Sequence, residues 1–479
     1  MIAVEILFWV SMFIVIYSYV GYGALIIIIS RIPFLIKLLP KPANIVKSEY
    51  IVKPELPYYP DISFIISASG ESKEIIKEKI INTFELIYPK DKLEIIFAIA
   101  YDTSSDKDET IEEFYDTFLE KQEGSGVSPV EEEVYLGFKK FENIEDYRTS
   151  SFLSEIEKEF ERIKFTSEEQ THEAKKKLDE YFQVNEAGNE LKIKITKDIE
   201  RKGKISQVNR TVKVAKGDIL VFSDANSMFN KEALVNISRH FRDKQVGCVA
   251  GEKRVRKSES STSGEGEGLY WKYESLLKKT DSKIWTTVGA AGEIFAIRKE
   301  LWGSGIEGNA IIEDFVISLR VAQKGYRVVY EPDAYAEEDP TFEVKEEFIR
   351  RRRIAAGGFQ SIVWLKALLN PFKYRILTFQ YVSHRVLRWA VVPFLLPIIL
   401  ILNVIILIDN FNLVYSILLF FQICFYLFAS IGYFLEKKRK KIKIFYLPFI
   451  LSMMNWAAYV GLKRYIKGQQ KVVWERAKR

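Results

Sequence analysis

Asp224 and Asn226 are the two side chains whose types and spacing point most directly to chemistry. They follow the apolar run 218–223, which is typical of a buried parallel strand. Because side chains two residues apart on an extended chain point the same way, a carboxylate and an amide oxygen would face one ligand. Such hard oxygen ligands can hold Mg²⁺ or Mn²⁺ against a diphosphate. Turns and helix caps use the same residue types, so the surrounding segments must decide between these interpretations.

Further polar residues lie beside the other apolar runs of this region. Open α/β sheets bind ligands beyond the carboxyl ends of their strands, so residues gathered there favour a binding site. Small residues at such a position also let the backbone approach a ligand closely. Each residue alone is more typical of a turn, and only their common position indicates a site. They are Ser67, Ser69, Glu71, Asp102 and Lys204.

Short apolar runs separated by helical patterns predict the scaffold that positions these residues. A helix is expected at 73–86, where apolar residues recur at helical spacing. Strands that alternate with helices are typical of a doubly wound, mostly parallel α/β sheet. The expected strands are 62–68, 93–100, 218–223, 246–250 and, as a further candidate, 327–330.

The stretch 111–191 interrupts this alternation. It is rich in Glu and Lys, and its apolar residues keep helical spacing in two segments. We expect a small helical insert whose charge forms a solvated surface. Binding of a partner is the alternative interpretation of the same charge.

The composition disfavours several kinds of site. The 479-residue chain has only three histidines, far apart, and two cysteines, one of them inside a hydrophobic run. A His-rich zinc site, a Ser-His-Asp triad and a disulfide are therefore not expected, and acid or base catalysis falls to Asp or Glu. The net charge of +6 is mild for this length, and the basic run 437–441 lies beside a hydrophobic segment. That pattern indicates a cytoplasmic membrane flank and no nucleic-acid partner.

Four apolar stretches predict a multi-pass protein of the cell membrane. Basic residues follow the first stretch, so the positive-inside rule places the next domain in the cytoplasm. The last stretch has basic clusters on both sides. Either the C-terminus is therefore outside, or this segment is re-entrant or interfacial. The stretches are 1–30, 386–408, 413–434 and 444–462.

The pattern at 360–374 predicts an amphipathic helix, either on the membrane surface or packed on the domain like an ordinary surface helix. Together these segments give the expected domain layout. It runs from an anchor (1–30) through a catalytic domain (48–355, with the insert 111–191) and the amphipathic helix to membrane segments (386–463) and a basic tail (464–479).

The order of these motifs resembles that of inverting, membrane-embedded family 2 glycosyltransferases with the GT-A fold, the group of the cellulose, hyaluronan and chitin synthases. Their sequences carry an Asp after the second strand, a Gly-Lys, a D-x-D, an acidic pair and then Q-x-x-R-W. The resemblance covers about 61–360 apart from the insert. It implies a GT-A-like domain that transfers a sugar from a nucleotide-sugar donor, expected to be a UDP-sugar, to a growing saccharide in polysaccharide biosynthesis. Mg²⁺ or Mn²⁺ is the implied cofactor.

On the donor side, the resemblance gives Asp102 the contact with uridine and Lys204 a place beside the nucleotide. Asp224 and Asn226 match the D-x-D and would bind the metal, with Asn in place of the second Asp. The amide can still ligate a hard cation through its carbonyl, with less charge. Ser67, Ser69 and Glu71 complete the expected nucleotide site.

On the acceptor side, Asp314 of the Glu313-Asp314 pair matches the general base, and inversion at an anomeric carbon does need one carboxylate to take the acceptor proton. Arg353 matches the arginine of Q-x-x-R-W and would face the diphosphate. Arg350 replaces the Gln and Ile354 replaces the Trp of that motif, which puts processive extension in question. The resemblance also places Gly292, Glu293, Ile354 and the C-terminal Trp474 near the acceptor.

Two other functions compete with this one. A transferase that moves one sugar to a polyprenyl phosphate would use a lipid-linked acceptor that needs no strong base. A non-catalytic membrane scaffold is the third hypothesis. It is allowed because Asn226 and Ile354 differ from the residues of the family motifs. The expected partners are the nucleotide-sugar donor, a saccharide or lipid-linked acceptor and the lipid bilayer, with a homo-oligomer as a further expectation.

Overall fold

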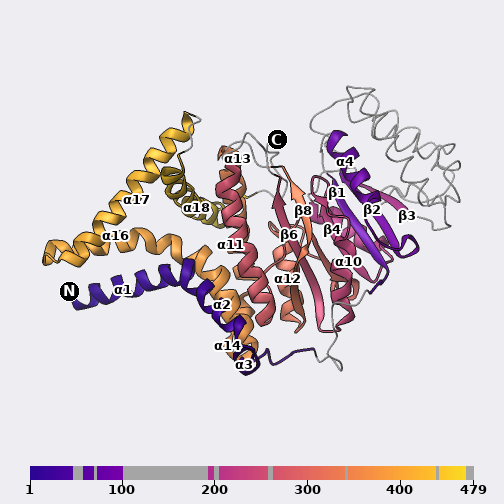
Figure 1. The fold of residues 1–479 in the computed structure, drawn as a ribbon, viewed down its shortest axis with the longest axis horizontal. Coiled ribbons are helices and arrows are strands. Elements are labelled where there is room, and N and C mark those ends of the chain that lie inside the picture. The colour runs from indigo at the N-terminus through magenta and orange to yellow at the C-terminus, as the bar shows by residue number, and fades with distance from the viewer. Residues whose placement is uncertain are drawn as a thin grey trace. The chain divides into compact units, whose positions relative to one another are not determined.

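A computed structural model describes residues 1–46, 58–68, 73–100, 192–198, 204–256, 263–339, 344–438 and 442–470 (Figure 1). The predicted insert at 111–191 lies outside these residues. The chain divides into two compact units. We call Pro54–Arg239 with Glu293–Asn309 the strand unit. The rest, Met1–Lys53, His240–Gly292 and Ala310–Arg479, is the membrane unit.

The strand unit is built on parallel strands in the order β3-β2-β1-β4, with β7 antiparallel at the β4 edge. All seven residues of β1 are buried, which explains its continuous apolar run. The strands are β1 (Ile62–Ala68), β2 (Leu93–Ala100), β3 (Lys192–Asp198), β4 (Ile219–Asp224), β5 (Met228–Phe229) and β7 (Phe295–Arg298). The helices are α4 (Lys73–Phe84), α9 (Lys204–Val214), α10 (Ala233–Ser238) and the 3₁₀ turns Lys90–Lys92 and Lys299–Leu301.

The membrane unit combines two long parallel strands, β6 (Val246–Val255) and β8 (Arg327–Glu338), with helices. Three of these helices carry or support candidate site residues. They are α11 (Ser263–Ile284), α12 (Glu313–Gln323) and α13 (Val344–Trp364). Shorter pieces are α3 (Pro33–Leu38), α14 (Pro371–Tyr374), α15 (Ile376–Tyr381) and the 3₁₀ turn Lys366–Leu369.

Among the residues that the structure describes, four helices, all in this unit, are long and apolar enough to cross a membrane, as the sequence predicted. Two of them contain π-helical stretches, Tyr17–Gly21 and Val382–Val391. The first helix joins α1 (Ile2–Ile16) to α2 (Tyr22–Arg31), and the second continues α15 into α16 (Val392–Asp409). The third and fourth are α17 (Leu413–Lys437) and α18 (Lys443–Ile466). The last apolar segment is thus one unbroken helix.

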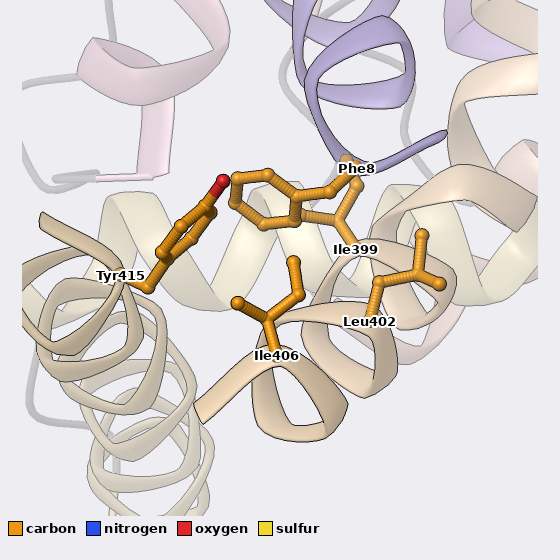
Figure 2. Close-up of a cluster of buried hydrophobic side chains, with 5 residues drawn as sticks. All are labelled: Phe8, Ile399, Leu402, Ile406 and Tyr415. Atoms are coloured by element: carbon orange, nitrogen blue, oxygen red, sulfur yellow. The ribbon is translucent and has the colours of Figure 1, made fainter. Parts of the chain in front are cut away.

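A buried apolar cluster joins α1, α16 and α17 (Figure 2). Phe8 lies edge-on to Tyr415, with 5.4 Å between ring centroids. The Tyr415 hydroxyl accepts a hydrogen bond of 3.0 Å from the indole of Trp9. This cluster fixes the N-terminal helix against the C-terminal ones, although their sequences are about 400 positions apart.

The strands expected at 62–68, 93–100, 218–223, 246–250 and 327–330 are all present, whereas β3 and β7 were not predicted. The single helix expected at 360–374 is wrong, because α13 ends at Trp364 and a new helix starts at Pro371. The 3₁₀ turn Lys366–Leu369 follows α13, and Pro371 then keeps the residue before it out of helical geometry. Asn370 instead caps the new turn by accepting from the N–H groups of Phe372 and Lys373.

Candidate active site

The carboxyl end of β4 brings three of the predicted donor residues together in the strand unit. Ser67 on β1 is in register with Asp224 on β4, and its carbonyl accepts from the N–H of Ala225 at 3.0 Å. Lys204, the first residue of α9, places its Nζ 2.5 Å from Oδ1 of Asp224. Both side chains stay about a third exposed, so a ligand can reach this ion pair.

Lys79, on α4, contacts the segment 223–227 that carries Asp224 and Asn226, and it was not predicted as part of the site. Its side chain is completely buried, and its ammonium donates to Oγ of Ser223 at 2.7 Å and to the carbonyl of Ser227. The rings of Phe64 and Phe229 lie 5.3 and 4.4 Å from the ammonium. Lys79 therefore ties together the two ends of the 223–227 segment, between which Asp224 and Asn226 stand.

The ligand chemistry of Asp224 and Asn226 fits a hard divalent cation. A carboxylate and an amide carbonyl are oxygen ligands, and the Lys204 ammonium already lies where the carboxylate attracts positive charge. Within the described residues, no three His, Cys, Asp or Glu side chains gather closely enough to hold a metal ion. A metal at Asp224 would therefore complete its coordination with phosphate oxygens and water, as Mg²⁺ commonly does.

Glu313 and Asp314 form the first turn of α12 in the membrane unit, where acidic side chains suit the helix dipole. Ser318, one turn further, donates to the carbonyl of Asp314 at 2.9 Å. The Ser318 hydroxyl also accepts from the N–H of Ala290 at 2.9 Å. Gly289 has φ +92°, and a Cβ there would lie 2.3 Å from the Phe315 ring. The 289–292 loop begins the stretch 289–298 that was predicted to lie near the acceptor, and it packs directly on the helix start that carries Asp314.

One face of α13 contacts Ile311 and Ile312, the two residues directly before Glu313 and Asp314. Arg353 donates to the carbonyl of Ile311 at 3.1 Å, and Gln360 accepts from the N–H of Ile311 at 2.9 Å. Between them, Gly357 leaves room for Ile312, since a Cβ would approach its side chain to 2.9 Å. Arg353, Gly357 and Gln360 recur at i, i+4 and i+7, so a single helical stripe fixes the approach to Asp314.

The other arginines of the run have different partners. Arg350 and Arg351 both pair with Glu347 on the same helix, at 2.9 and 2.6 Å. Burial raises the pKa of the Glu347 carboxyl, but the two guanidinium groups outweigh it and hold that pKa at about 2. Arg350 is thus engaged within α13, where the family motif has a glutamine.

The predicted site residues fall into three groups. The strand unit holds Ser67, Lys204, Asp224, Asn226 and Glu293, and the membrane unit holds Gly292, Glu313, Asp314, Arg353 and Ile354. Ser69, Glu71, Asp102 and Trp474 lie outside the described residues. The sequence offered a signal for Lys79, since it stands one helical turn after Ile75 in an otherwise apolar stripe. Gln360 carried no such signal.

Comparison with known proteins indicates a chemical class. Residues 209–434 match the family described as glycosyl transferase family group 2. This segment, a little under half of the chain, is thus similar to that family. The match covers the segments that hold Asp224, Asp314 and Arg353, and it supports a transferase.

Curated relatives agree with this class. The poly-beta-1,6-N-acetyl-D-glucosamine synthase of Staphylococcus aureus is 27% identical over 139 residues, which are 28% of this chain and 33% of that protein. The O-antigen chain rhamnosyltransferase WbaN of Salmonella anatum is 27% identical over 140 residues, 28% of this chain and 44% of the relative. The matched stretch thus spans a third to less than half of each relative.

A solved structure shares the fold over nearly the whole chain. The mannosyltransferase PcManGT from Pyrobaculum calidifontis, solved with GDP-Man and Mn²⁺, superposes with a TM-score of 0.56 at 18% identity. The similarity covers 97% of this chain and 100% of that one. The expected GT-A-like fold with membrane helices is therefore confirmed.

Proposed function

We propose that this glycosyltransferase moves a sugar, with inversion, from a nucleotide-sugar to a growing saccharide at the cytoplasmic face of the membrane. The observation that carries the proposal is the Asp224–Lys204 pair at the carboxyl end of β4. A carboxylate that can ligate a metal and an ammonium that can bind phosphate stand 2.5 Å apart, at the sheet edge where α/β folds bind ligands. The S. aureus relative that is named as a polysaccharide synthase supports the polymeric acceptor.

The strand unit would bind the donor. Asp224 and Asn226 would hold Mg²⁺ or Mn²⁺, which supplies charge to stabilise the departing diphosphate. Lys204 would exchange its contact with Asp224 for one with a phosphate oxygen. Ser67 would let the backbone of β1 come close to the nucleotide, and Ser69, Glu71 and Asp102 remain proposed nucleotide contacts.

The membrane unit would activate the acceptor. Asp314, at the start of α12, would take the proton from the attacking hydroxyl, and Glu313 beside it would shape the local charge. Arg353 would hold the Ile311–Ile312 approach in place, which adds an orienting role to the predicted contact with diphosphate. Gly292, Glu293, Ile354 and Trp474 remain the proposed acceptor contacts. A polyprenyl phosphate acceptor would need no such base.

Nucleotide release by purified protein in lipid vesicles tests the proposal. The donor panel should include UDP-N-acetylglucosamine and other UDP-sugars, and also GDP-mannose because of the structural relative. We expect Mg²⁺- or Mn²⁺-dependent release with one donor, and incorporation of its sugar into a saccharide. Incorporation only into a lipid-phosphate product would support the polyprenyl alternative. Nucleotide binding without turnover of any donor would support a scaffold.

A further inference from the structure

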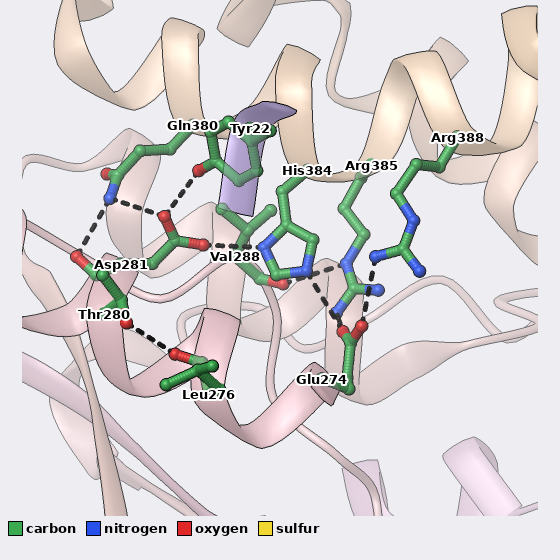
Figure 3. Close-up of polar contacts among 10 residues, drawn as sticks. All are labelled: Tyr22, Glu274, Leu276, Thr280, Asp281, Val288, Gln380, His384, Arg385 and Arg388. Atoms are coloured by element: carbon green, nitrogen blue, oxygen red, sulfur yellow. Dashed lines mark hydrogen bonds and ion pairs between the residues drawn. The ribbon is translucent and has the colours of Figure 1, made fainter. Parts of the chain in front are cut away.

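A buried cluster of charged side chains connects α11 to the two helices that carry π-helical stretches (Figure 3). His384, Arg385 and Arg388 lie in the π-helix Val382–Val391, within the second candidate membrane span. They point toward Glu274 and Asp281 on α11. Ionisable groups within membrane segments are rare and usually functional, and π-helical turns are frequent at functional sites. The proposed reaction uses none of these residues.

The contacts around His384 leave both ring nitrogens against carboxylates. Nδ1 lies 2.6 Å from Oδ2 of Asp281, and Nε2 lies 3.2 Å from Oε1 of Glu274. Asp281 also accepts from the hydroxyl of Tyr22 at 2.5 Å and from the amide of Gln380. The first membrane helix, α11 and the second membrane helix therefore meet at Asp281.

Glu274 is the second centre of the cluster. It pairs with Arg385 and, at 3.2 Å, with Arg388. Burial raises the pKa of the Glu274 carboxyl, but Arg385, His384 and Arg388 together hold it well below its usual range. Arg385 and Arg388 thus share the ionised carboxylate of Glu274. Substituting each in turn therefore separates the loss of this shared ion pair from the loss of the other contacts that one arginine makes.

Arg385 extends this cluster to the acceptor side of the site. Its Nε donates to the carbonyl of Val288 at 3.3 Å, at the entry to the 289–292 loop. Its guanidinium lies 6.0 Å from the ring centroid of Phe315 and 5.5 Å from that of Trp389. Phe315 directly follows Asp314, and its ring packs 5.0 Å from Trp389.

We propose that Arg385 is a positioning residue for the acceptor half of the reaction. From within a membrane helix, it fastens the entry to the 289–292 loop and the start of α12 to Glu274. It thereby sets the position of Asp314. A planar guanidinium can bind a carboxylate, donate to a carbonyl and stack on rings at the same time, which an ammonium cannot. The inference rests on the proposed function, because it assigns Arg385 to the base of that reaction.

Amide hydrogen exchange of the full chain in nanodiscs tests whether Arg385 fastens these segments, without relying on activity. Arg385→Gln should speed exchange about tenfold or more in peptides covering 286–292 and 311–318, because those segments lose their fastening. Arg388→Gln is the matched control, since it removes a cation from the same carboxylate. Arg385→Lys keeps the charge without the fork and should fall between wild type and Arg385→Gln.

Transfer kinetics give the functional readout. Arg385→Gln should lower turnover with acceptor about 10- to 100-fold and leave donor affinity unchanged, since misplacement of a base slows chemistry more than binding. Unchanged exchange in both peptides, equal effects of Arg385→Gln and Arg388→Gln, or faster exchange throughout the membrane unit would overturn the proposal. If the wild type shows no transfer activity but exchange changes only in Arg385→Gln, the proposed function is refuted. The structural role of Arg385 in fastening the two segments is then still supported.

Discussion

Asp224 and Asp314 are the two carboxylates that we assign to the reaction, and the chain holds them by different means. Asp224 ends a strand and depends on other elements of the strand unit, namely Lys204 of α9 and the buried Lys79 of α4. Asp314 begins a helix whose approach is held by α13, and whose flank is tied through Arg385 to membrane helices. For the proposed reaction we infer that donor binding is local, whereas acceptor activation is coupled to the membrane unit.

The largest effect should come from the acceptor carboxylate itself. Asp314→Asn keeps the shape of the side chain but removes the base, so turnover should fall by about 10²- to 10⁴-fold. Sugar incorporation from a radiolabelled donor measures the change. Glu300→Gln, an exposed carboxyl in the strand unit, is the control and should keep wild-type turnover. Equal activity of the two variants would remove Asp314 from the reaction.

Lys79 offers the matching test on the donor side. Lys79→Met should weaken binding of Mn²⁺ with nucleotide about 10- to 100-fold, because the segment that carries Asp224 and Asn226 loses its anchor. Calorimetric titration gives the affinity, and Lys92→Met, at an exposed lysine, serves as the control. Wild-type affinity in Lys79→Met would mean that the segment holds its shape without the ammonium.

The α13 stripe should affect stability more than donor binding. Gln360→Leu leaves the buried N–H of Ile311 without its acceptor, which costs about 1–3 kcal/mol of unfolding free energy. Thermal unfolding in detergent measures the loss. Ser361→Ala removes only a hydroxyl that bonds back within α13 and should cost less. The reverse order would show that Gln360 is not the residue that holds the approach to Asp314.

Glu347 predicts a smaller effect that depends on pH. Its folded pKa of about 2 lies below the usual carboxyl value, so its stabilisation is present above about pH 4.5 and is lost as pH falls toward 2. Glu347→Gln should lower unfolding free energy by about 1–2 kcal/mol at pH 6, with the gap to wild type closing below pH 4. A gap that stays constant from pH 6 to pH 3 would contradict the pairing with Arg350 and Arg351.

The sequence predicted those parts of the fold that local pattern determines. The strands β1, β2 and β4 are apolar runs because they are buried in a parallel sheet. The candidate membrane helices can be predicted from their length and hydropathy. The strand β7 has only four residues, too few for a pattern, and β3 alternates lysine with apolar residues at the end of a charged stretch. The single helix expected at 360–374 is wrong because its apolar spacing continues across Pro371, where the backbone leaves helical geometry and a new helix begins.

The candidate site was predictable to a similar extent. Asp224, Asp314 and Arg353 could be named because they match motifs of the family that the sequence resembles. Gln360 and Arg385 could not, because their roles depend on contacts with residues 49 and 97 positions away. Such supporting residues become visible only when the chain is folded, since no local pattern encodes a long-range hydrogen bond.

The division between donor binding and acceptor activation is the central claim, and one comparison tests it most directly. Donor affinity and sugar transfer should be measured on the same preparations of Asp224→Asn and Asp314→Asn, in lipid and with Mn²⁺. The account predicts that Asp224→Asn loses donor binding, whereas Asp314→Asn binds the donor like wild type and does not transfer its sugar. Loss of donor binding in Asp314→Asn, or normal binding and transfer in Asp224→Asn, would contradict it.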